Sequence, residues 1–267
     1  MSHGEDDAHG PLVPSPVFIF SPVRAGSTLL RCVLGSNSHI HAPQELHLTG
    51  LTVHTSDMLT RRALDTLGMT TRDLEHFLWD HLLHHELVRS GKQVLVEKTP
   101  EHVLSWRRIA EYWPAARYIF LIRHPVHIAA SLSQIFEEPV AITEVLKYAH
   151  AMDEARAELA GPTVRYEDLT THPEEVISQL CTFLDVPWEP EMLDYGRFDH
   201  GPFDHGPFAP GLGDWSENIH SGRIQPPRPM STKIPEALEP CCTSWGYLES
   251  SIQPSRCDFP ETMTGRS

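Results

Sequence analysis

The sequence predicts an α/β fold in which a parallel sheet is flanked by helices, followed by an irregular C-terminal tail. Short apolar runs rich in Val, Ile and Phe recur along the chain, and segments with apolar residues at helical spacing lie between them. This alternation is typical of parallel sheets, because two parallel strands need a long crossover connection. At 267 residues the chain is long enough to bury a complete core behind such a sheet.

The N-terminal third contains a predicted strand, a loop and two helices. Residues 1–16 hold three prolines and predict a flexible N-terminus. A strand is predicted at residues 17–20, and a helix begins at Ser27. Apolar residues spaced by three or four predict an amphipathic helix over residues 72–89, and Gly91 should end it.

Three more strands complete the predicted core, which spans residues 17–190. They lie at residues 94–96, 117–122 and 164–166. The strand at 94–96 leads to Pro100 and the strand at 117–122 to Pro125, each placed where the first turn of a helix is expected.

The end of the core and the tail have different patterns. Thr171 to Glu174 fits a capping box and predicts the start of a helix that continues to Leu184. Beyond Pro187 the periodicity is lost, and residues 198–208 contain a short echo, FDHGPFDHGPF. We interpret residues 191–267 as a lid or wrapping segment of the same domain.

Composition excludes several function classes. Asp and Glu number 36 against 21 Lys and Arg, so the net charge of −15 disfavours binding to nucleic acid or to an anionic membrane. No apolar run has the roughly 20 residues that a membrane span needs, and the acidic N-terminus does not resemble a signal peptide. We therefore expect a cytoplasmic protein, whose five cysteines are reduced thiols without metal-site spacing.

The loop SPVRAGST at residues 21–28 has the features of an anion site. Gly26 allows a close backbone approach, and the amides around Ser27 and Thr28 form a helix N-terminus, to which Arg24 adds a cation. A Walker A loop would have a lysine after the glycine, and its absence disfavours a P-loop-type kinase. An ordinary turn in which Ser27 caps the helix is the alternative interpretation.

A second pair of donors follows the strand at residues 117–122. Arg123 ends this strand, and Ser131 comes eight residues later on the next helix. Hydrogen-bond donors that follow two neighbouring strands are suited to binding two phosphates of one ligand, and Arg123 and Ser131 would bind the second. Together with the loop they predict a nucleotide that is phosphorylated at two separate places.

These motifs resemble those of sulfotransferases that use 3′-phosphoadenosine 5′-phosphosulfate. The resemblance spans about residues 17–190 and rests on SPVRAGSTLL, IRHPVHIAASL and VRYEDLTTHPEEVISQLCTFLDVPW, in this order. The chain looks closest to bacterial enzymes and olefin-synthase sulfotransferase domains, and more distantly resembles tyrosylprotein sulfotransferases. The resemblance implies a P-loop-like sheet and transfer of a sulfuryl group to a hydroxyl.

The resemblance also implies roles for individual residues. A glutamate stands at position 45, where several relatives place a catalytic base, and Lys98 in EKTP is similar to a lysine that contacts the transferring group. The implied donor site consists of Arg24, Ala25, Gly26, Ser27 and Thr28 around the 5′-phosphosulfate, Arg123 and Ser131 at the 3′-phosphate, and Tyr166 near the nucleotide.

The chemistry needs these residue types. An acceptor hydroxyl requires a base within hydrogen-bond reach as its bond to sulfur forms, and Glu45 suits that need. In-line transfer then depends on positioning and on charge stabilisation by Arg24, Lys98 and the loop amides, so no metal is expected. His41 and His47 flank Glu45 and are alternatives that orient or replace it.

Several questions stay open at this stage. Candidates for closing over the nucleotide are Gly211, Gly213, Arg223 and Arg228, while His200 and His205 are weak candidates for the acceptor pocket. The acceptor is a metabolite, a sugar or a carrier-bound acyl chain, and a diffusible small molecule of secondary metabolism is favoured. A non-catalytic nucleotide-binding relative is a further alternative, and the oligomeric state is open.

Overall fold

The computed structural model describes residues 10–200, 219, 221–226 and 233–248, and it contains a five-stranded parallel sheet. The strand order is β2 (Ile40–His41), β3 (Val94–Glu97), β1 (Val17–Phe20), β4 (Arg117–Ile122) and β5 (Thr163–Arg165). All four strand pairings are parallel, with Val17 opposite Val96 on one side and Arg117 on the other. The predicted α/β class is therefore confirmed.

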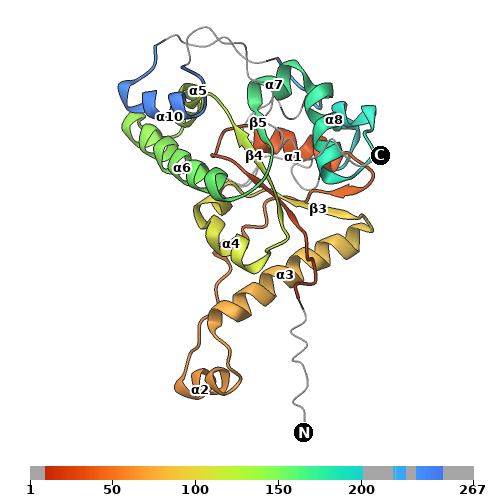
Figure 1. Cartoon of the computed structure of the whole chain (residues 1–267), viewed down its shortest axis with the longest axis vertical. Coiled ribbons are helices and arrows are strands. Elements are labelled where there is room, and N and C mark those ends of the chain that lie inside the picture. The colour runs from red at the N-terminus through yellow and green to blue at the C-terminus, as the bar shows by residue number, and fades with distance from the viewer. Residues whose placement is uncertain (1–9, 201–218, 220, 227–232, 249–267) are drawn as a thin grey trace.

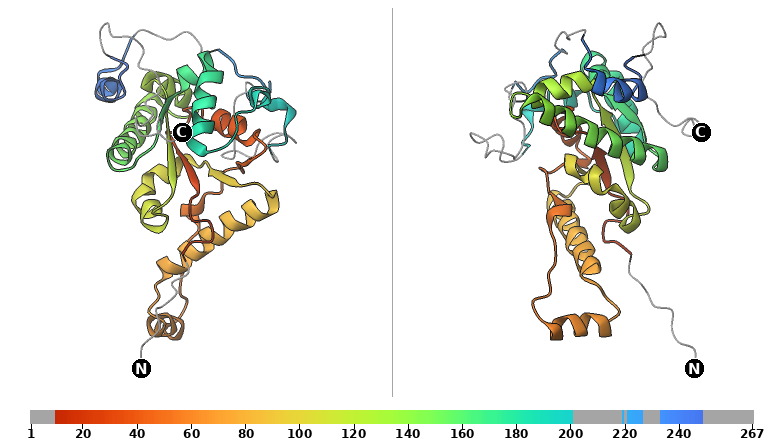
Figure 2. Two further views of the ribbon diagram at one scale, coloured as in Figure 1. Left: turned by 45° about the vertical axis from the view of Figure 1, so that its right-hand side comes forward. Right: turned by 90° about the vertical axis from the view of Figure 1, so that its left-hand side faces the viewer.

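Helices cover both faces of this sheet (Figures 1 and 2). On one face α1 (Ser27–Gly35) and α8 (Pro173–Leu184) bury Leu30 and Ile177 against the strands. The other face is covered by α3 (Thr71–Ser90), α4 (Trp106–Tyr112), α5 (Pro125–Leu132) and α6 (Glu138–Glu158). The strand residues alternate between these two cores, as the period of a strand requires.

Two helices begin differently from the prediction. Pro100 opens a 3₁₀ turn, η2 (Pro100–Ser105), and the α-helix α4 follows only after it. Tyr166 is not the end of a strand but the first residue of a short helix, α7 (Tyr166–Thr171). The capping box predicted at Thr171 does not form, because Thr171 ends α7 and its hydroxyl donates to the Glu167 carbonyl at 2.8 Å.

Three further strands or α-helices of the N-terminal 190 residues, besides α7, were not predicted from the sequence. The strand β2 has only two residues, too few for a periodic signal. In α6 the buried positions Ala141, Val145, Ala149 and Met152 have helical spacing, but small alanines weaken the apolar pattern. The third is α2 (Met58–Thr66), which is capped by Asp57, has no buried residue and stands away from the sheet (Figure 1).

The described parts at both ends of the chain pack onto the domain. Leu12 and Val13 donate their amides to the Asp80 carboxylate on α3, at 2.5 and 3.1 Å, so these two residues are attached to the domain. Near the C-terminus, α10 (Glu239–Ser244) lies against α6 (Figure 1). The Trp245 indole donates to Asp153 Oδ1 at 2.8 Å.

Other short 3₁₀ turns are η1 (Leu48–Gly50), η3 (Pro190–Leu193), η4 (Tyr195–Arg197) and η6 (Glu236–Leu238). Cys32, Cys181, Cys241 and Cys242 are buried free thiols, while Cys257 lies outside the described residues. Within the described part of the chain, no helix is both long and apolar enough to span a membrane.

Candidate active site

The loop after β1 turns sharply into α1. Arg24 has φ 65° and Gly26 has φ 96°, both in the left-handed region, and Ala25 donates its amide to the Pro22 carbonyl. Gly26 is the N-cap residue of α1 and no side chain caps this helix, so the interpretation of Ser27 as the cap is wrong. The first-turn amides of α1 are thus free of a side-chain cap, and such amides attract anions.

The two predicted phosphate motifs meet at this loop. Arg24 Nε donates to Ser131 Oγ at 2.9 Å, and an Arg123 guanidinium N–H donates to the Arg24 carbonyl at 3.0 Å. The Arg123 guanidinium also lies over the Tyr166 ring, 4.5 Å from its centroid. A Cβ on Gly26 would overlap the Tyr166 ring, so only glycine allows this packing.

Arg123 has unused hydrogen-bonding capacity. Its Nε is buried and has no hydrogen-bond partner among the described residues. Burial lowers the pKa of Arg123, and the neighbouring charge of Arg24 acts in the same direction. Buried donors are normally paired, so an Nε of this kind suits an anionic oxygen supplied by a ligand.

Glu45 and Lys98 form an ion pair next to the same loop. Glu45 lies beyond β2 and Lys98 directly follows β3, and the Lys98 ammonium contacts Glu45 Oε1. Lys98 also donates to Thr28 Oγ1 at 3.3 Å, in the first turn of α1. Lys98 therefore bridges the carboxylate and the phosphate loop.

Lys98 is almost completely buried, with 1% of its surface exposed. Burial lowers the pKa of Lys98, and the charge of Arg31 lowers it further, whereas Glu45 opposes the shift. Glu45 itself keeps 15% of its side chain accessible. The carboxylate is thus the part of the pair that a second substrate can reach.

The structure separates the two histidines that flank Glu45. His47 Nε2 lies 3.4 Å from Glu45 Oε2, so His47 is placed to orient the carboxylate. His41 points elsewhere, because its Nε2 lies 3.1 Å from Glu86 Oε2 on α3. Burial lowers the pKa of His41 despite this acidic neighbour.

The candidates in the tail are only partly described. His200 Nε2 donates a 2.7 Å hydrogen bond to the Tyr195 carbonyl, and Arg223 is exposed. His205, Gly211, Gly213 and Arg228 lie outside the described residues. No three His, Cys, Asp or Glu side chains are grouped like metal ligands in the part of the chain that the structure describes.

Sequence reasoning missed four buried residues next to this site. These are Arg31 on α1, Glu97 at the end of β3, and the nearby Thr99 and His102. The available signal was the charged residue within each apolar stretch, STLLRCVL and VLVEK, since an unpaired charge is rarely buried.

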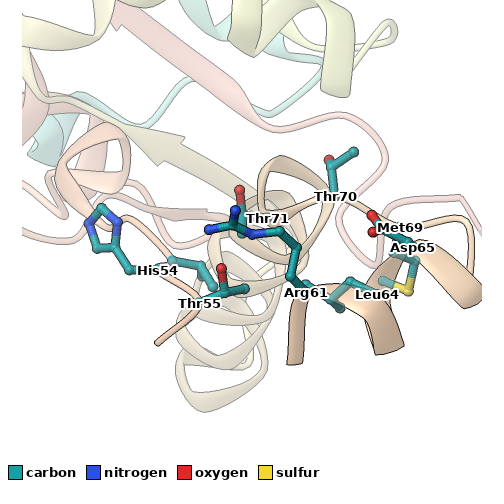
Figure 3. A pocket seen from close by; sticks show the side chains of 9 residues that line it. His54, Thr55, Arg61, Leu64, Asp65, Met69, Thr70 and Thr71 are labelled. Atoms are coloured by element: carbon teal, nitrogen blue, oxygen red, sulfur yellow. The ribbon is translucent and has the colours of Figure 1, made fainter. Parts of the chain in front are cut away.

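A separate groove lies between α2 and the start of α3 (Figure 3). It has a volume of about 440 Å³, and its lining includes His54, Thr55, Arg61 and Thr71. It contains none of the predicted site residues.

Comparison with known proteins identifies the family of this chain. The model of the sulfotransferase family matches residues 16–190, about two thirds of the sequence. The chain belongs to the sulfotransferase family. The match covers the phosphate loop, Glu45, Lys98 and the Arg123 to Ser131 segment, which the fold brings together around one loop.

Curated relatives of this chain have low sequence identity to it. Protein-tyrosine sulfotransferase 1 of Danio rerio is 24% identical over 200 residues, covering 67% of this chain and 55% of the relative. Nodulation protein NoeE of Sinorhizobium fredii is 24% identical over 206 residues, covering 63% of this chain and 49% of the relative. The chain thus spans about half the length of these curated relatives.

Solved structures with similar folds support the fold of this chain. The sulfotransferase domain of the curacin biosynthetic pathway has a TM-score of 0.64 at 23% identity and covers 87% of this chain and 98% of that domain. The sulfotransferase domain of the Synechococcus olefin synthase has a TM-score of 0.65 at 18% identity, covering 92% and 99%. These structural similarities extend beyond residue 190, whereas the family match ends there.

Proposed function

We propose that this sulfotransferase transfers a sulfuryl group from 3′-phosphoadenosine 5′-phosphosulfate to a hydroxyl of a small-molecule acceptor. The observation that carries the proposal is the bridge made by Lys98 between Glu45 and Thr28. It puts a carboxylate and an ammonium beside an anion-binding helix N-terminus, which is the arrangement that in-line transfer to a hydroxyl requires.

The donor would be held at two places. Residues 24–28 and the first-turn amides of α1 would bind its 5′-phosphosulfate, and Arg24 would add a positive charge there. Arg123 and Ser131 would bind its 3′-phosphate, with Tyr166 against the nucleotide. The unpartnered Nε of Arg123 fits an extra phosphate, which a donor such as ATP would not place there.

Glu45 would act as the general base. When bound, the donor supplies an activated sulfuryl group with a good phosphate leaving group. Glu45 accepts the proton of the acceptor hydroxyl, and His47 holds the second carboxylate oxygen. Lys98 and Arg24 stabilise the negative charge that develops on the leaving side.

We also propose that residues 191–267 belong to the same domain as the core. Leu238, Cys242 and Trp245 are part of the core cluster on the α6 face. The Tyr247 hydroxyl donates to Glu167 Oε2 at 2.7 Å. Glu167 directly follows Tyr166, the residue proposed to lie against the nucleotide. The tail therefore reaches the edge of the proposed nucleotide site.

The proposal can be tested with ³⁵S-labelled donor and a panel of acceptors. The panel contains 2-naphthol, a primary and a secondary alkanol, a monosaccharide and a tyrosine peptide, each incubated with the purified chain. We expect label to appear on a small alcohol or phenol together with adenosine 3′,5′-bisphosphate. Transfer of γ-phosphate from ATP instead would identify a kinase, and tight binding of the bisphosphate without transfer to any acceptor would indicate a non-catalytic protein.

A further inference from the structure

Glu97 is a buried carboxylate that the proposed chemistry does not use. It is the last residue of β3, has no exposed surface and directly precedes Lys98. Burial alone would raise the pKa of Glu97, but the charge of His102 and the hydrogen bonds from His102, Thr99 and the Leu46 amide together lower it. Keeping an ionised carboxylate out of water costs several kcal/mol unless it is well paired, so its contacts indicate what it holds.

Glu97 and Thr99 hold the backbone that follows Glu45. Glu97 Oε1 accepts the Leu46 amide at 3.2 Å and the Thr99 hydroxyl at 2.6 Å. The Thr99 hydroxyl oxygen in turn accepts the His47 amide at 3.2 Å. The two amides directly after Glu45 are therefore both bound by side chains from the end of β3.

The hydrogen bond between the His47 amide and Thr99 holds His47 in an unfavourable backbone conformation. Its φ of 46° is in the left-handed region, which costs a residue with a side chain about 1 kcal/mol or more. The hydrogen bond to Thr99 helps to hold that conformation, which sends the chain from Glu45 into η1. The same conformation places the His47 ring beside Glu45.

The segment before Glu45 is fixed from α1. The Arg31 guanidinium, 3% exposed, donates to the Ala42 carbonyl at 3.1 Å and to the Pro43 carbonyl at 3.5 Å. On the far side of Glu97, His102 Nδ1 lies 2.6 Å from Glu97 Oε2. Glu45 thus lies between two stretches whose backbone is held by buried side chains. Arg31 holds the stretch before it, and Glu97 with Thr99 forms a clamp on the stretch after it.

We propose that Glu97 and Thr99 are positioning residues for Glu45, which fix the turn at residues 45–47 so that the carboxylate stays beside Lys98 and Thr28. The inference rests on the proposed role of Glu45 as base. A displacement of a catalytic group by about 1 Å can cost roughly 100-fold in rate, so loss of these contacts should affect turnover more than binding.

The pair Thr99→Val and Thr99→Ser separates the hydroxyl from the packing. Thr99→Val keeps the shape but removes the hydroxyl, and we expect kcat for the best acceptor of the panel to fall about 10-fold to 100-fold. The dissociation constant of adenosine 3′,5′-bisphosphate should change less than about twofold, because the Thr99 hydroxyl bonds to Glu97 and His47, which are outside the phosphate loop. Thr99→Ser keeps the hydroxyl and should recover most of kcat.

Thr163→Val is the matched control. Thr163 is also buried, and its hydroxyl accepts a hydrogen bond from Arg156 Nε at 3.2 Å. It lies on β5, the edge strand on the far side of the sheet from β2 and β3. This variant should lose stability to a similar extent as Thr99→Val but keep kcat. Glu97→Gln keeps an oxygen in the place of Oε1 that can still accept from the Leu46 amide and the Thr99 hydroxyl, so it should lower kcat much less than Thr99→Val.

A double-mutant cycle that combines Thr99→Val with Glu45→Gln decides whether Thr99 acts through Glu45. If it does, Thr99→Val should have almost no further effect on kcat in the Glu45→Gln background. An equal fall in both backgrounds, or an unchanged kcat in Thr99→Val, would overturn the proposal.

Amide hydrogen exchange gives a second readout that needs no acceptor. Exchange at Leu46 and His47 should become faster in Thr99→Val and not in Thr163→Val. If Glu45→Gln alone keeps full activity, the base assignment is wrong, and the exchange rates still show whether Thr99 holds the turn. Unchanged exchange in Thr99→Val would refute the clamp itself.

Discussion

Arg24 and Ser131, which are 107 residues apart in the sequence, share a 2.9 Å hydrogen bond from Arg24 Nε to Ser131 Oγ. This bond joins the loop after β1 to the helix after β4, and these strands are neighbours in the sheet. The carboxyl ends of neighbouring parallel strands meet at one edge, where open α/β sheets bind their ligands. The two predicted phosphate motifs therefore lie in contact at one edge of the sheet, and the predictions below test their proposed roles separately.

Replacing Glu45 tests the base. Glu45→Ala should lower kcat by about 10²-fold to 10⁴-fold, because proton removal from the acceptor contributes that much to the rate. Binding of adenosine 3′,5′-bisphosphate, measured by calorimetry, should be almost unchanged. Glu111→Ala, which removes an exposed carboxylate on α4, is the control. Full activity in Glu45→Ala would show that another group takes the proton.

Replacing Arg123 tests the 3′-phosphate site. Arg123→Ala should weaken binding of adenosine 3′,5′-bisphosphate by about 1.5 to 3 kcal/mol, as expected for the loss of a charge-assisted contact. Binding of adenosine 5′-monophosphate, which lacks the 3′-phosphate, should change much less. Arg107→Ala removes an exposed arginine that pairs with Glu154 and should affect neither ligand. Equal losses for both nucleotides would place the 3′-phosphate elsewhere.

The lowered pKa of Lys98 should appear in the pH dependence of stability. Between that lowered pKa and the ordinary value of 10.5, the unfolded chain keeps a proton on Lys98 that the folded chain has released. Stability rises with pH wherever the unfolded state binds more protons, so Lys98 makes the free energy of unfolding increase across this range.

Lys98→Met removes this contribution. The free energy of unfolding of the wild-type chain minus that of the variant should therefore grow as the pH rises through the range, as measured by urea denaturation. A difference that stays constant with pH would mean that Lys98 titrates alike in the folded and unfolded chains.

Gly26→Ala tests the packing of the phosphate loop. The substitution forces a φ of 96° on a residue with a side chain and drives its Cβ into the Tyr166 ring, so we expect a loss of about 1 to 3 kcal/mol in stability. Gly68→Ala, at φ 68° with open space around its Cβ, measures the cost of the backbone conformation alone. Similar losses in the two variants would show that the Tyr166 ring moves aside freely.

The sequence by itself determined the fold class and most of the elements that carry the site. Apolar runs at 17–20, 94–96 and 117–122 have the length and composition of buried strands, and the loops after them contain residues with distinctive chemistry, which local patterns reveal. The strand predicted to reach Tyr166 and the capping box predicted at Thr171 were wrong for a local reason, since the short helix α7 begins at Tyr166 and only His172 separates it from α8.

Only the tertiary structure decided which side chains meet. His41 and His47 both lie within a few residues of Glu45 in the sequence, yet β2 turns His41 toward Glu86 on α3 while the left-handed turn at His47 brings that ring to Glu45. The clamp of Glu97 and Thr99 on the Glu45 turn joins residues about 50 positions apart. Such contacts depend on the order of strands in the sheet, and no periodic pattern along the chain encodes that order.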